Sequence, residues 1–416
     1  MPASPTATDG EFVHRDLDSG VEFATELLPQ RDTVSMCFRV LTGVVDDPPE
    51  LTGVGSLVER TLSKGTERYD GRALADAFDS VGAQWSSLSG RQSMIVWVVC
   101  LPEFVLDIVD LVAEMICHPT FPQDACQVAV ELAQQDLRHM EDEPHELLRV
   151  MIQRLTLGPL LGRYPGGEPE TLARITRDGI QSHWRQCYDA GRLQVAVAGP
   201  VDADALAGRI DARFAGLGRA QRAGREPADF TFRPGRLHRH KDLQQEYIGI
   251  TLPGVPRDHQ DFATEQVLIG VLSGGMSGRL FTEVREKQGL VYWVGAWHEE
   301  PRGKGVVHLG AGTTPERCHR TYETLLRELE RLAEDLTEDE TRRARDGLIA
   351  QHETESDLTR ARAAGLSEDL FHFSRPVGLT PKLEAIRAVT VADVEGLVHR
   401  LPRDQICVAT LGTRAL

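Results

Sequence analysis

The chain has 416 residues, of which 41% are hydrophobic and 26% are charged, as in ordinary globular proteins. This length provides enough apolar side chains for two or three domains. Its 46 basic and 63 acidic residues give a formal net charge of −17. Because a general acidic field repels nucleic acids and anionic lipid surfaces, we expect neither of them among the partners.

The targeting and redox features of the sequence predict a cytoplasmic protein. No apolar run reaches the roughly 18 residues of a membrane span. Residues 1–12, MPASPTATDGEF, lack the basic region and the apolar core of a signal peptide, and we expect them to form a frayed tail. No C-x-x-C pair is present, so buried or free thiols in a reducing compartment are expected. The cysteines are Cys37, Cys100, Cys117, Cys126, Cys187, Cys318 and Cys407.

The first half of the chain alternates between strand and helix patterns. The predicted strands lie at 20–29, 32–47, 85–102 and 191–202. The predicted helices lie at 53–64, 72–84, 103–116 and 203–217, and 123–157 is largely helical. Residues 218–230, GRAQRAGREPADF, carry charge, Gly and Pro without an apolar period, which indicates a linker.

The second half repeats this order of elements. Its predicted strands lie at 245–254, 290–297, 304–312 and 404–413, with a helix from about Asp261 and long helices from Pro315 onward. Each half therefore runs strands, helices, strands, long helices and a final strand. We predict two similar domains of about 200 residues, 1–217 and 231–416, joined by the linker.

The segment GVGSLVERTLSKGT, residues 53–66, has a regular helical pattern. Thr52 is placed to cap this helix and Gly65 to close it. The apolar side chains fall on one face and the polar ones on the other, so the simplest interpretation is an amphipathic helix with a solvated side. The apolar face carries Val54, Leu57, Val58 and Leu62, and the polar face carries Ser56, Glu59, Arg60 and Ser63.

A zinc peptidase helix of the H-x-x-E-H type places two histidines four positions apart to hold zinc. A glutamate directly before the second histidine acts as general base. Residues 53–66 resemble this helix in the pitrilysin/insulinase family, where a glycine and apolar residues precede H-x-x-E-H and K-G-T follows. Ser56 and Arg60 stand where the family has its histidines, and Glu59 keeps the position of the general base.

Further segments resemble the same family in the same order. Asp136 lies 76 residues after Arg60, in QQDLRHMEDEP, where the family carries glutamate as its third zinc ligand. The segments 163–176, 188–202 and 271–294 are also similar, so the resemblance extends over nearly the whole chain. It implies an α+β fold with two similar α/β-roll domains, each a mostly antiparallel sheet packed with helices.

The residues at the ligand positions predict a degenerate zinc site. A serine hydroxyl is a poor zinc ligand at neutral pH, and an arginine does not deprotonate to become one. We therefore expect no metal on this chain and no peptidase activity of the chain alone. Since an uncompensated buried carboxylate is costly, the Arg60 guanidinium is expected to pair with Asp136 across the site.

The segment SGGMSGRLFTEVREKQGLVYWVGAW begins at Ser273. Gly274 and Gly275 predict a tight turn, and Ser277 is placed to cap a helix that runs to about Lys287. Gly289 is placed to end this helix, and a strand follows it. Turns and helix–strand junctions of this kind occur in most α/β domains.

The resemblance assigns a role to this segment as well. Family members carry an arginine and a tyrosine seven positions apart, which donate hydrogen bonds to the substrate carbonyl as it becomes an oxyanion. Arg285 and Tyr292 have this spacing. The turn at Gly274 and Gly275 resembles, in shorter form, the glycine-rich loop of the non-catalytic subunit of mitochondrial processing peptidase, which is associated with substrate handling.

Lost zinc ligands together with a retained Arg/Tyr pair predict the non-catalytic subunit of a heterodimeric zinc metallopeptidase. The resemblance implies a homologous partner that carries H-x-x-E-H and the zinc, with an unstructured peptide as substrate. Two alternatives remain open. One is a structural subunit, like the silent relatives in the respiratory cytochrome bc complex. The other is a stand-alone or homodimeric peptide-binding protein without peptidase activity.

Overall fold

The computed structural model describes residues 9–218 and 230–416, so the predicted linker lies almost wholly outside the described residues. Within these ranges the chain forms two units, and each unit takes one segment from the other half of the sequence. Unit 1 contains residues 9–139, 163–218 and 355–379. Unit 2 contains residues 140–162, 230–354 and 380–416.

Unit 1 is built on a six-stranded sheet with the order β1-β2-β6-β3-β5-β4. Its strands are β1 (Glu11–Asp16), β2 (Glu22–Leu27), β3 (Val34–Val40), β4 (Gln84–Ser89), β5 (Met94–Cys100) and β6 (Leu193–Gly199). β2 and β6 run parallel, and every other pair is antiparallel. The edge strand β1 was not predicted, because its sequence EFVHRD is mostly polar and solvent-facing and lacks the alternation of a half-buried strand.

Unit 2 is built on a five-stranded sheet with the order β7-β11-β8-β10-β9. Its strands are β7 (Gly235–His240), β8 (Glu246–Gly254), β9 (Val291–Glu299), β10 (Gly305–Thr313) and β11 (Cys407–Gly412). β7 and β11 run parallel, and the remaining pairs are antiparallel.

The predicted repeat is confirmed by strand pairing. Leaving β1 aside, the first sheet reads β2-β6-β3-β5-β4 and the second β7-β11-β8-β10-β9, so equivalent strands occupy equivalent places. The parallel pair also falls at the same place, formed by the first and last strands of each repeat. The α+β fold with two similar, mostly antiparallel sheets is therefore as predicted.

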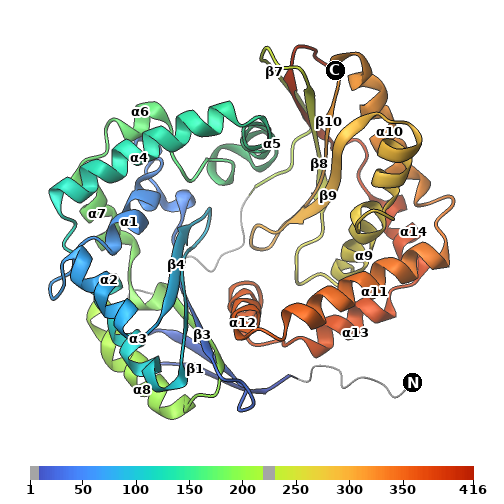
Figure 1. The fold of residues 1–416 in the computed structure, drawn as a ribbon. Helices are drawn as coiled ribbons and strands as arrows, with labels where there is room; N and C mark the ends of the chain where they lie inside the picture. The colour runs from blue at the N-terminus through green and yellow to red at the C-terminus, as the bar shows by residue number, and fades with distance from the viewer. Residues whose placement is uncertain (1–8, 219–229) are drawn as a thin grey trace. The chain divides into compact units, whose positions relative to one another are not determined.

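Each half of the sequence contributes one helix to the sheet formed by the other half (Figure 1). Helix α12 (Thr359–Phe373) packs on β2, β3 and β6, whereas α5 (Pro144–Leu161) packs on β7, β8 and β11. These two sets of strands are equivalent in the repeat. A single cut of the chain at 218–230 therefore does not separate the units, and the boundaries 1–217 and 231–416 need this correction.

Helix α12 is held on the first sheet by apolar and polar contacts. Leu366 and Leu370 pack with Ala24, Cys37 and Ala196. The Arg39 guanidinium from β3 donates to the Ser367 hydroxyl at 3.0 Å and contacts the Glu368 carboxylate. Arg362 is ion-paired with the buried Glu26 of β2. Because these polar groups are buried and partnered, the position of the helix on the sheet is specific.

The contacts between helix α5 and the second sheet are more apolar than those between α12 and the first sheet. Its buried side chains Leu147, Leu148, Met151 and Ile152 pack on Cys407, Ala409 and Leu411 of β11. One buried hydrogen bond joins the Thr156 and Thr251 hydroxyls at 2.6 Å. The helix bends at Gly158, which has a φ of +74°, directly before Pro159.

Each sequence half contains further helices, of which α1 and α3 contact the first sheet and α9, η6 and α10 contact the second (Figure 1). In the first half these helices are α1 (Val54–Leu62), α2 (Gly71–Ser80), α3 (Val105–Cys117), α4 (Gln123–Asp142), α6 (Pro169–Leu172), α7 (Arg177–Cys187) and α8 (Ala203–Phe214). In the second half they are α9 (Phe262–Ser273), the π-helix η6 (Leu280–Lys287), α10 (Cys318–Arg331), α11 (Glu338–Glu355), α13 (Thr380–Ala388) and α14 (Val391–Arg400).

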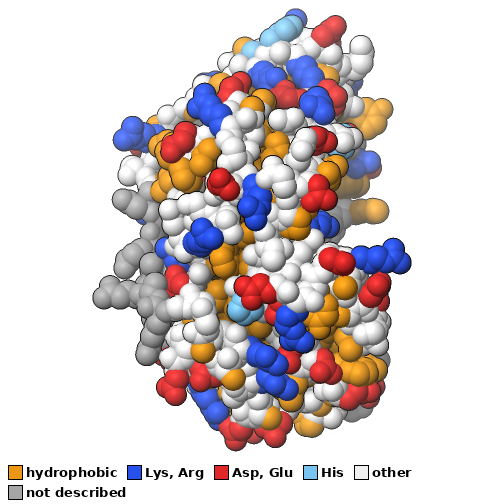
Figure 2. All heavy atoms as spheres, turned by 90° about the vertical axis from the view of Figure 1, so that its left-hand side faces the viewer, with side chains coloured by type: hydrophobic (Ala, Val, Ile, Leu, Met, Phe, Trp, Pro, Cys, Tyr) orange, Lys and Arg blue, Asp and Glu red, His pale blue; other side chains and the backbone are white. Residues whose placement is uncertain are grey.

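Charged side chains of both signs lie on the surface, and the cysteines lie in the interior. Figure 2 shows acidic and basic side chains intermingled on the face that it presents. All seven cysteines are buried. In the part of the chain that the structure describes, none of the helices is long and apolar enough to cross a membrane.

Candidate functional site

Helix α1 is held at its first turn by Asp47. The Asp47 carboxylate accepts hydrogen bonds from the backbone N–H of Gly53 at 2.7 Å and of Gly55 at 3.1 Å. Gly53 has a φ of +102°, a conformation that suits glycine, and begins the helix without a side-chain cap of its own. The prediction of Thr52 as the cap was wrong, because its hydroxyl instead donates to the Pro49 carbonyl at 3.1 Å.

A buried histidine lies beside this aspartate. His183 Nε2 is 3.5 Å from the Asp47 Oδ1 atom, and both side chains are almost completely buried. Burial raises the pKa of Asp47 to about 7 and lowers the pKa of His183 to about 4. The start of α1 therefore sits in a low-dielectric environment where the imidazole is neutral at pH 7.

The two faces of α1 are as predicted. Its apolar side chains Val54, Leu57, Val58 and Leu62 are buried, whereas Ser56, Glu59 and Arg60 are partly exposed. The helix ends at Leu62, three residues before the predicted Gly65, and its C-cap residue is Ser63. Ser56, Glu59 and Arg60 thus lie on the side of α1 that faces away from the core.

Arg60 and Asp136 are in direct contact. The Arg60 Nη2 atom donates to the Asp136 Oδ2 atom at 2.7 Å, which joins α1 to α4 across 76 residues of sequence. Their side chains are 32% and 57% exposed. The expected contact is therefore present, but the reason given for it needs correction, because Asp136 is not a buried carboxylate.

Glu59 points to a different neighbour. Its carboxylate accepts a hydrogen bond from the Ser87 hydroxyl on β4. Burial raises the pKa of Glu59, against the opposing effects of the Ser87 hydrogen bond and the nearby Arg60 charge. A carboxyl group with a raised pKa is suited to proton transfer, but that chemistry requires a reacting group beside it.

The side chains at these positions do not fit a zinc ion. A zinc site needs three or four nitrogen, sulfur or carboxylate donors, and the guanidinium of Arg60 has no lone pair to offer. The Asp136 carboxylate is already ion-paired with that guanidinium. Within residues 9–218 and 230–416, no cluster of three His, Cys, Asp or Glu side chains has the arrangement of a metal site.

The second group of predicted residues lies in unit 2 and starts at a tight turn after α9. Gly275 has a φ of +91°, and a Cβ atom on Gly274 would lie 2.3 Å from the Gly270 carbonyl oxygen, so both positions require glycine. Met276 at the tip is 81% exposed. The predicted cap Ser277 was wrong, because the helix starts after Arg279 and has no side-chain cap.

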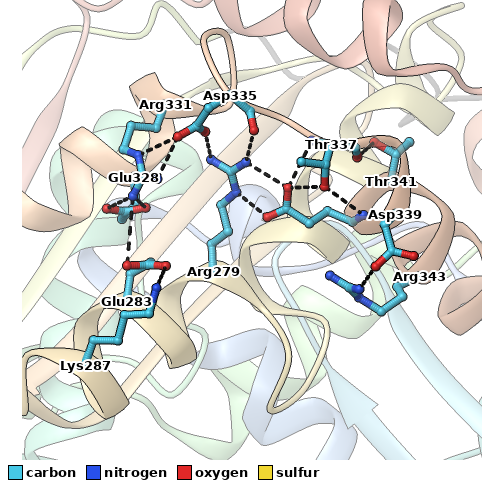
Figure 3. A network of polar contacts seen from close by, with 11 residues as sticks. Arg279, Glu283, Lys287, Glu328, Arg331, Asp335, Thr337, Asp339, Thr341 and Arg343 are labelled. Atoms are coloured by element: carbon cyan, nitrogen blue, oxygen red, sulfur yellow. Dashed lines mark hydrogen bonds and ion pairs between the residues drawn. The ribbon is translucent and has the colours of Figure 1, made fainter.

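The helix after this turn is a π-helix, Leu280–Lys287, which is a rare element often found at functional sites. Figure 3 shows how Arg279, directly before it, is fixed. The buried Arg279 guanidinium donates to Asp335 Oδ1 at 2.6 Å and to Glu340 Oε1 at 2.7 Å. At the other end of the helix, Lys287 pairs with Glu283 at 2.8 Å. The Arg279 contacts tie the start of the π-helix to Asp335, between α10 and α11, and to Glu340 in the first turn of α11, whereas the Lys287–Glu283 pair lies within the π-helix itself.

Arg285 and Tyr292 are both available to a ligand. The Arg285 guanidinium lies 4.8 Å from the centre of the Phe281 ring and is solvent-exposed. Tyr292 on β9 is 76% exposed, and its hydroxyl has no hydrogen-bond partner among the described residues. A guanidinium and a phenol with free donors are able to hydrogen-bond an incoming carbonyl.

Sequence reasoning missed three residues that shape these sites. Asp47 precedes α1 by several residues, so its capping role does not follow from local sequence, although an aspartate before a helix is a known capping signal. Ser87 could be placed next to Glu59 only through strand β4. Arg279 lies in the glycine-turn segment that begins at Ser273, but its acidic partners come from a distant part of the chain.

The fold is that of a two-domain α+β protein, and comparisons with known families assign it to a family. The model of the insulinase family (peptidase family M16) matches residues 22–158. The model of the peptidase M16 inactive domain matches residues 174–348. The chain therefore belongs to the M16 peptidase family.

Relatives of similar length are known from several bacteria. A protein named uncharacterized zinc protease from Bacillus subtilis is 24% identical over 396 residues, which is 94% of this chain and 96% of that protein. One of the same name from Mycobacterium tuberculosis is 27% identical over 430 residues, 99% of this chain and 95% of that protein.

Two solved structures share the fold. The crystal structure of a protease from Helicobacter pylori has a TM-score of 0.89 at 15% identity and covers 97% of this chain and 99% of that chain. The structure of a peptidase M16 inactive domain from Pseudomonas fluorescens has a TM-score of 0.88 at 20% identity, with 97% and 98% covered.

Proposed function

We propose that this chain is the non-catalytic subunit of a heterodimeric zinc metallopeptidase of the M16 type. The observation that carries the proposal is the ion pair between Arg60 and Asp136. It occupies two of the positions that the family uses for zinc ligands, and it leaves no donor set for the metal. The chain thus has the family fold without the means to activate water.

The residues at the ligand positions are the reason why we expect the chain alone to be inactive. Arginine carries a permanent charge, so the guanidinium both repels a divalent cation and neutralises the carboxylate that would bind it. Glu59 keeps its place on α1 but has no metal-bound water from which to take a proton. Instead, the Glu59 carboxylate accepts a hydrogen bond from the Ser87 hydroxyl.

The proposed contribution of this chain is to bind and polarise the substrate. Arg285 and Tyr292 present exposed donors on two neighbouring elements, η6 and β9. Hydrogen-bond donors aimed at a developing oxyanion lower the barrier of peptide hydrolysis when the donors are held in place beforehand. The Arg279 network and the two glycines of the turn hold the π-helix that carries Arg285.

The partner in this proposal is a homologous chain with an intact H-x-x-E-H helix, which holds the zinc ion. The substrate is an unstructured peptide, bound by its backbone as an added strand. The zinc supplies the activated water in the partner, and this chain supplies donors for the substrate carbonyl. Two alternatives would use the same fold without a catalytic partner. One is a scaffold role, and the other is a homodimer that binds peptides without cleaving them.

The proposal is tested by metal analysis and peptide cleavage with two purified chains. We expect the chain alone to hold less than stoichiometric zinc after dialysis and to leave a generic unstructured peptide uncut. Addition of an H-x-x-E-H homologue from the same organism should form a 1:1 complex by light scattering and start cleavage. Stoichiometric zinc and hydrolysis by the lone chain would overturn the proposal, and so would a partner whose activity is the same with and without this chain.

A further inference from the structure

Strand β9 is the outer strand of the second sheet and carries two partly exposed tryptophans on one face. Trp293 and Trp297 are each 37% exposed. In the described part of the chain β9 pairs with β10 alone, so its other edge is free of a strand partner. The unpaired N–H and C=O groups of an edge strand are a template for an added strand.

The sheet beneath these tryptophans has a row of glycines. Strand register places Gly310 of β10 directly opposite both Gly249 of β8 and Gly295 of β9. A Cβ atom on Gly310 would lie 2.5 Å from the Trp293 ring and 3.2 Å from the Trp297 ring. The six-membered rings of both indoles therefore reach over Gly310, into space that any larger residue at position 310 would occupy.

The two rings lean towards each other along the strand. Residues four positions apart in a strand are separated by about 13 Å along the backbone. The ring centres of Trp293 and Trp297 are only 6.3 Å apart. The space between them lies over Gly295, which has no side chain, so the rings and the glycine row form a shallow aromatic surface beside the free edge.

This surface is rigid because other aromatic side chains support it. The Trp297 ring stacks on the buried His308 ring, with centres 5.1 Å apart and an interplanar angle of 3°. His308 Nε2 in turn lies 3.0 Å from the Glu299 carboxylate. The Trp293 ring packs edge-on against His145 of α5, with centres 5.0 Å apart. Aromatic groups that are already fixed lose little conformational entropy when a ligand binds.

We propose that Trp293 and Trp297, beside the free edge of β9, form a subsite that binds large apolar side chains of an extended peptide. The edge supplies backbone hydrogen bonds, and the two indoles supply apolar contact area for side chains on one face of the added strand. Tyr292, one of the proposed oxyanion donors, directly precedes Trp293 on the same strand. The inference rests on the proposed function for the choice of a peptide as ligand.

Binding to the isolated full chain tests the subsite without a partner subunit. The probe is a labelled 12-residue peptide of Ser, Thr, Gly and Lys with Phe at two positions separated by one residue. The matched probe carries Ala at both positions, and a third peptide carries the Phe residues with N-methyl groups along its backbone. Affinities are measured by fluorescence anisotropy and checked by isothermal titration calorimetry.

We expect the Phe peptide to bind at least tenfold more tightly than the Ala peptide and the N-methylated peptide. The Trp293→Ala/Trp297→Ala double variant should bind the Phe and Ala peptides equally. Leu237→Ala is the matched control, because Leu237 is 41% exposed on β7, the opposite edge strand of the same sheet, and should keep the full preference.

Equal binding of the Phe and Ala peptides to the parent chain would overturn the proposal, and this comparison needs no folded variant. A folded double variant that keeps the preference would overturn it as well. Because no partner is present, failure here is distinguishable from failure of the proposed function. That function stands if the partner becomes active on addition of this chain.

Discussion

The Arg60 guanidinium lies 2.7 Å from the Asp136 carboxylate, and both side chains remain open to solvent. An exposed ion pair of this kind contributes little to stability, typically below about 1 kcal/mol. Its position is therefore more informative than its energy. It brings a cation to the place where the family resemblance puts a metal ligand, and it connects α1 to α4 at the two positions that the resemblance pairs.

This register predicts that zinc binding can be restored. The double variant Ser56→His/Arg60→His places two imidazoles four residues apart on the outer face of α1 and releases Asp136 from its cation. We expect one zinc ion per chain after dialysis, measured by inductively coupled plasma mass spectrometry. The single variant Ser56→His keeps the Arg60–Asp136 pair and should stay metal-free. A folded double variant without zinc would show that the three positions do not form a ligand set.

The Arg285 and Tyr292 side chains are predicted to affect turnover and not folding. In the reconstituted complex, Arg285→Ala or Tyr292→Phe should lower kcat by about 100-fold to 1,000-fold, as expected for loss of an oxyanion donor. The free energy of unfolding should change by less than about 0.5 kcal/mol, because both side chains are exposed. Lys287→Ala, on the same π-helix, is the matched control and should keep the parent kcat. An unchanged kcat in both test variants would instead support the scaffold role.

Arg279 is predicted to be important for stability. Arg279→Ala leaves the carboxylates of Asp335 and Glu340 without their shared cation, which should cost about 3 kcal/mol in urea unfolding. Burial by itself would raise the pKa of Glu340, but hydrogen bonds from Arg279 and Thr337 hold it at about 2. Arg342→Ala, which breaks an exposed pair with Asp339, should be indistinguishable from the parent protein. Equal stability of the two variants would contradict the role of the network in Figure 3.

His298 is predicted to make stability depend on pH. Burial alone would lower the pKa of His298, but hydrogen bonds to Glu265 and Glu300 and their charges raise it to about 9. Because the folded state binds the proton more tightly than the unfolded state, this contribution is fully present below about pH 6.5 and is lost as pH rises towards 9.

The size of this effect follows from the shift, on the order of 3 kcal/mol across that range. Urea unfolding at several pH values measures it. The variant His298→Gln should have a flatter dependence of stability on pH between 6.5 and 9. His319→Gln, an exposed histidine on α10, serves as the control and should keep the slope of the parent protein. Parallel slopes for the parent and His298→Gln would refute the assignment.

Much of the local structure could be predicted from the residues. The pattern of Val54, Leu57, Val58 and Leu62 identified the buried face of α1, because a helix exposes one side every 3.6 residues. The order of strands and helices in the two halves predicted the repeat that the two sheets display. The helix ends were less accurate, because capping at α1 comes from Asp47 and at η6 from no side chain at all.

What the sequence by itself determined is therefore the repeat, the faces of its helices and the 76-residue spacing that joins Arg60 to Asp136. What only the tertiary structure decided is which sheet each helix covers. Helices α5 and α12 cover equivalent strands in opposite halves. An apolar helix face by itself does not distinguish one sheet from the other. Buried partners such as Arg39 with Ser367 and Thr156 with Thr251 specify that choice, and such pairs exist only once distant segments meet.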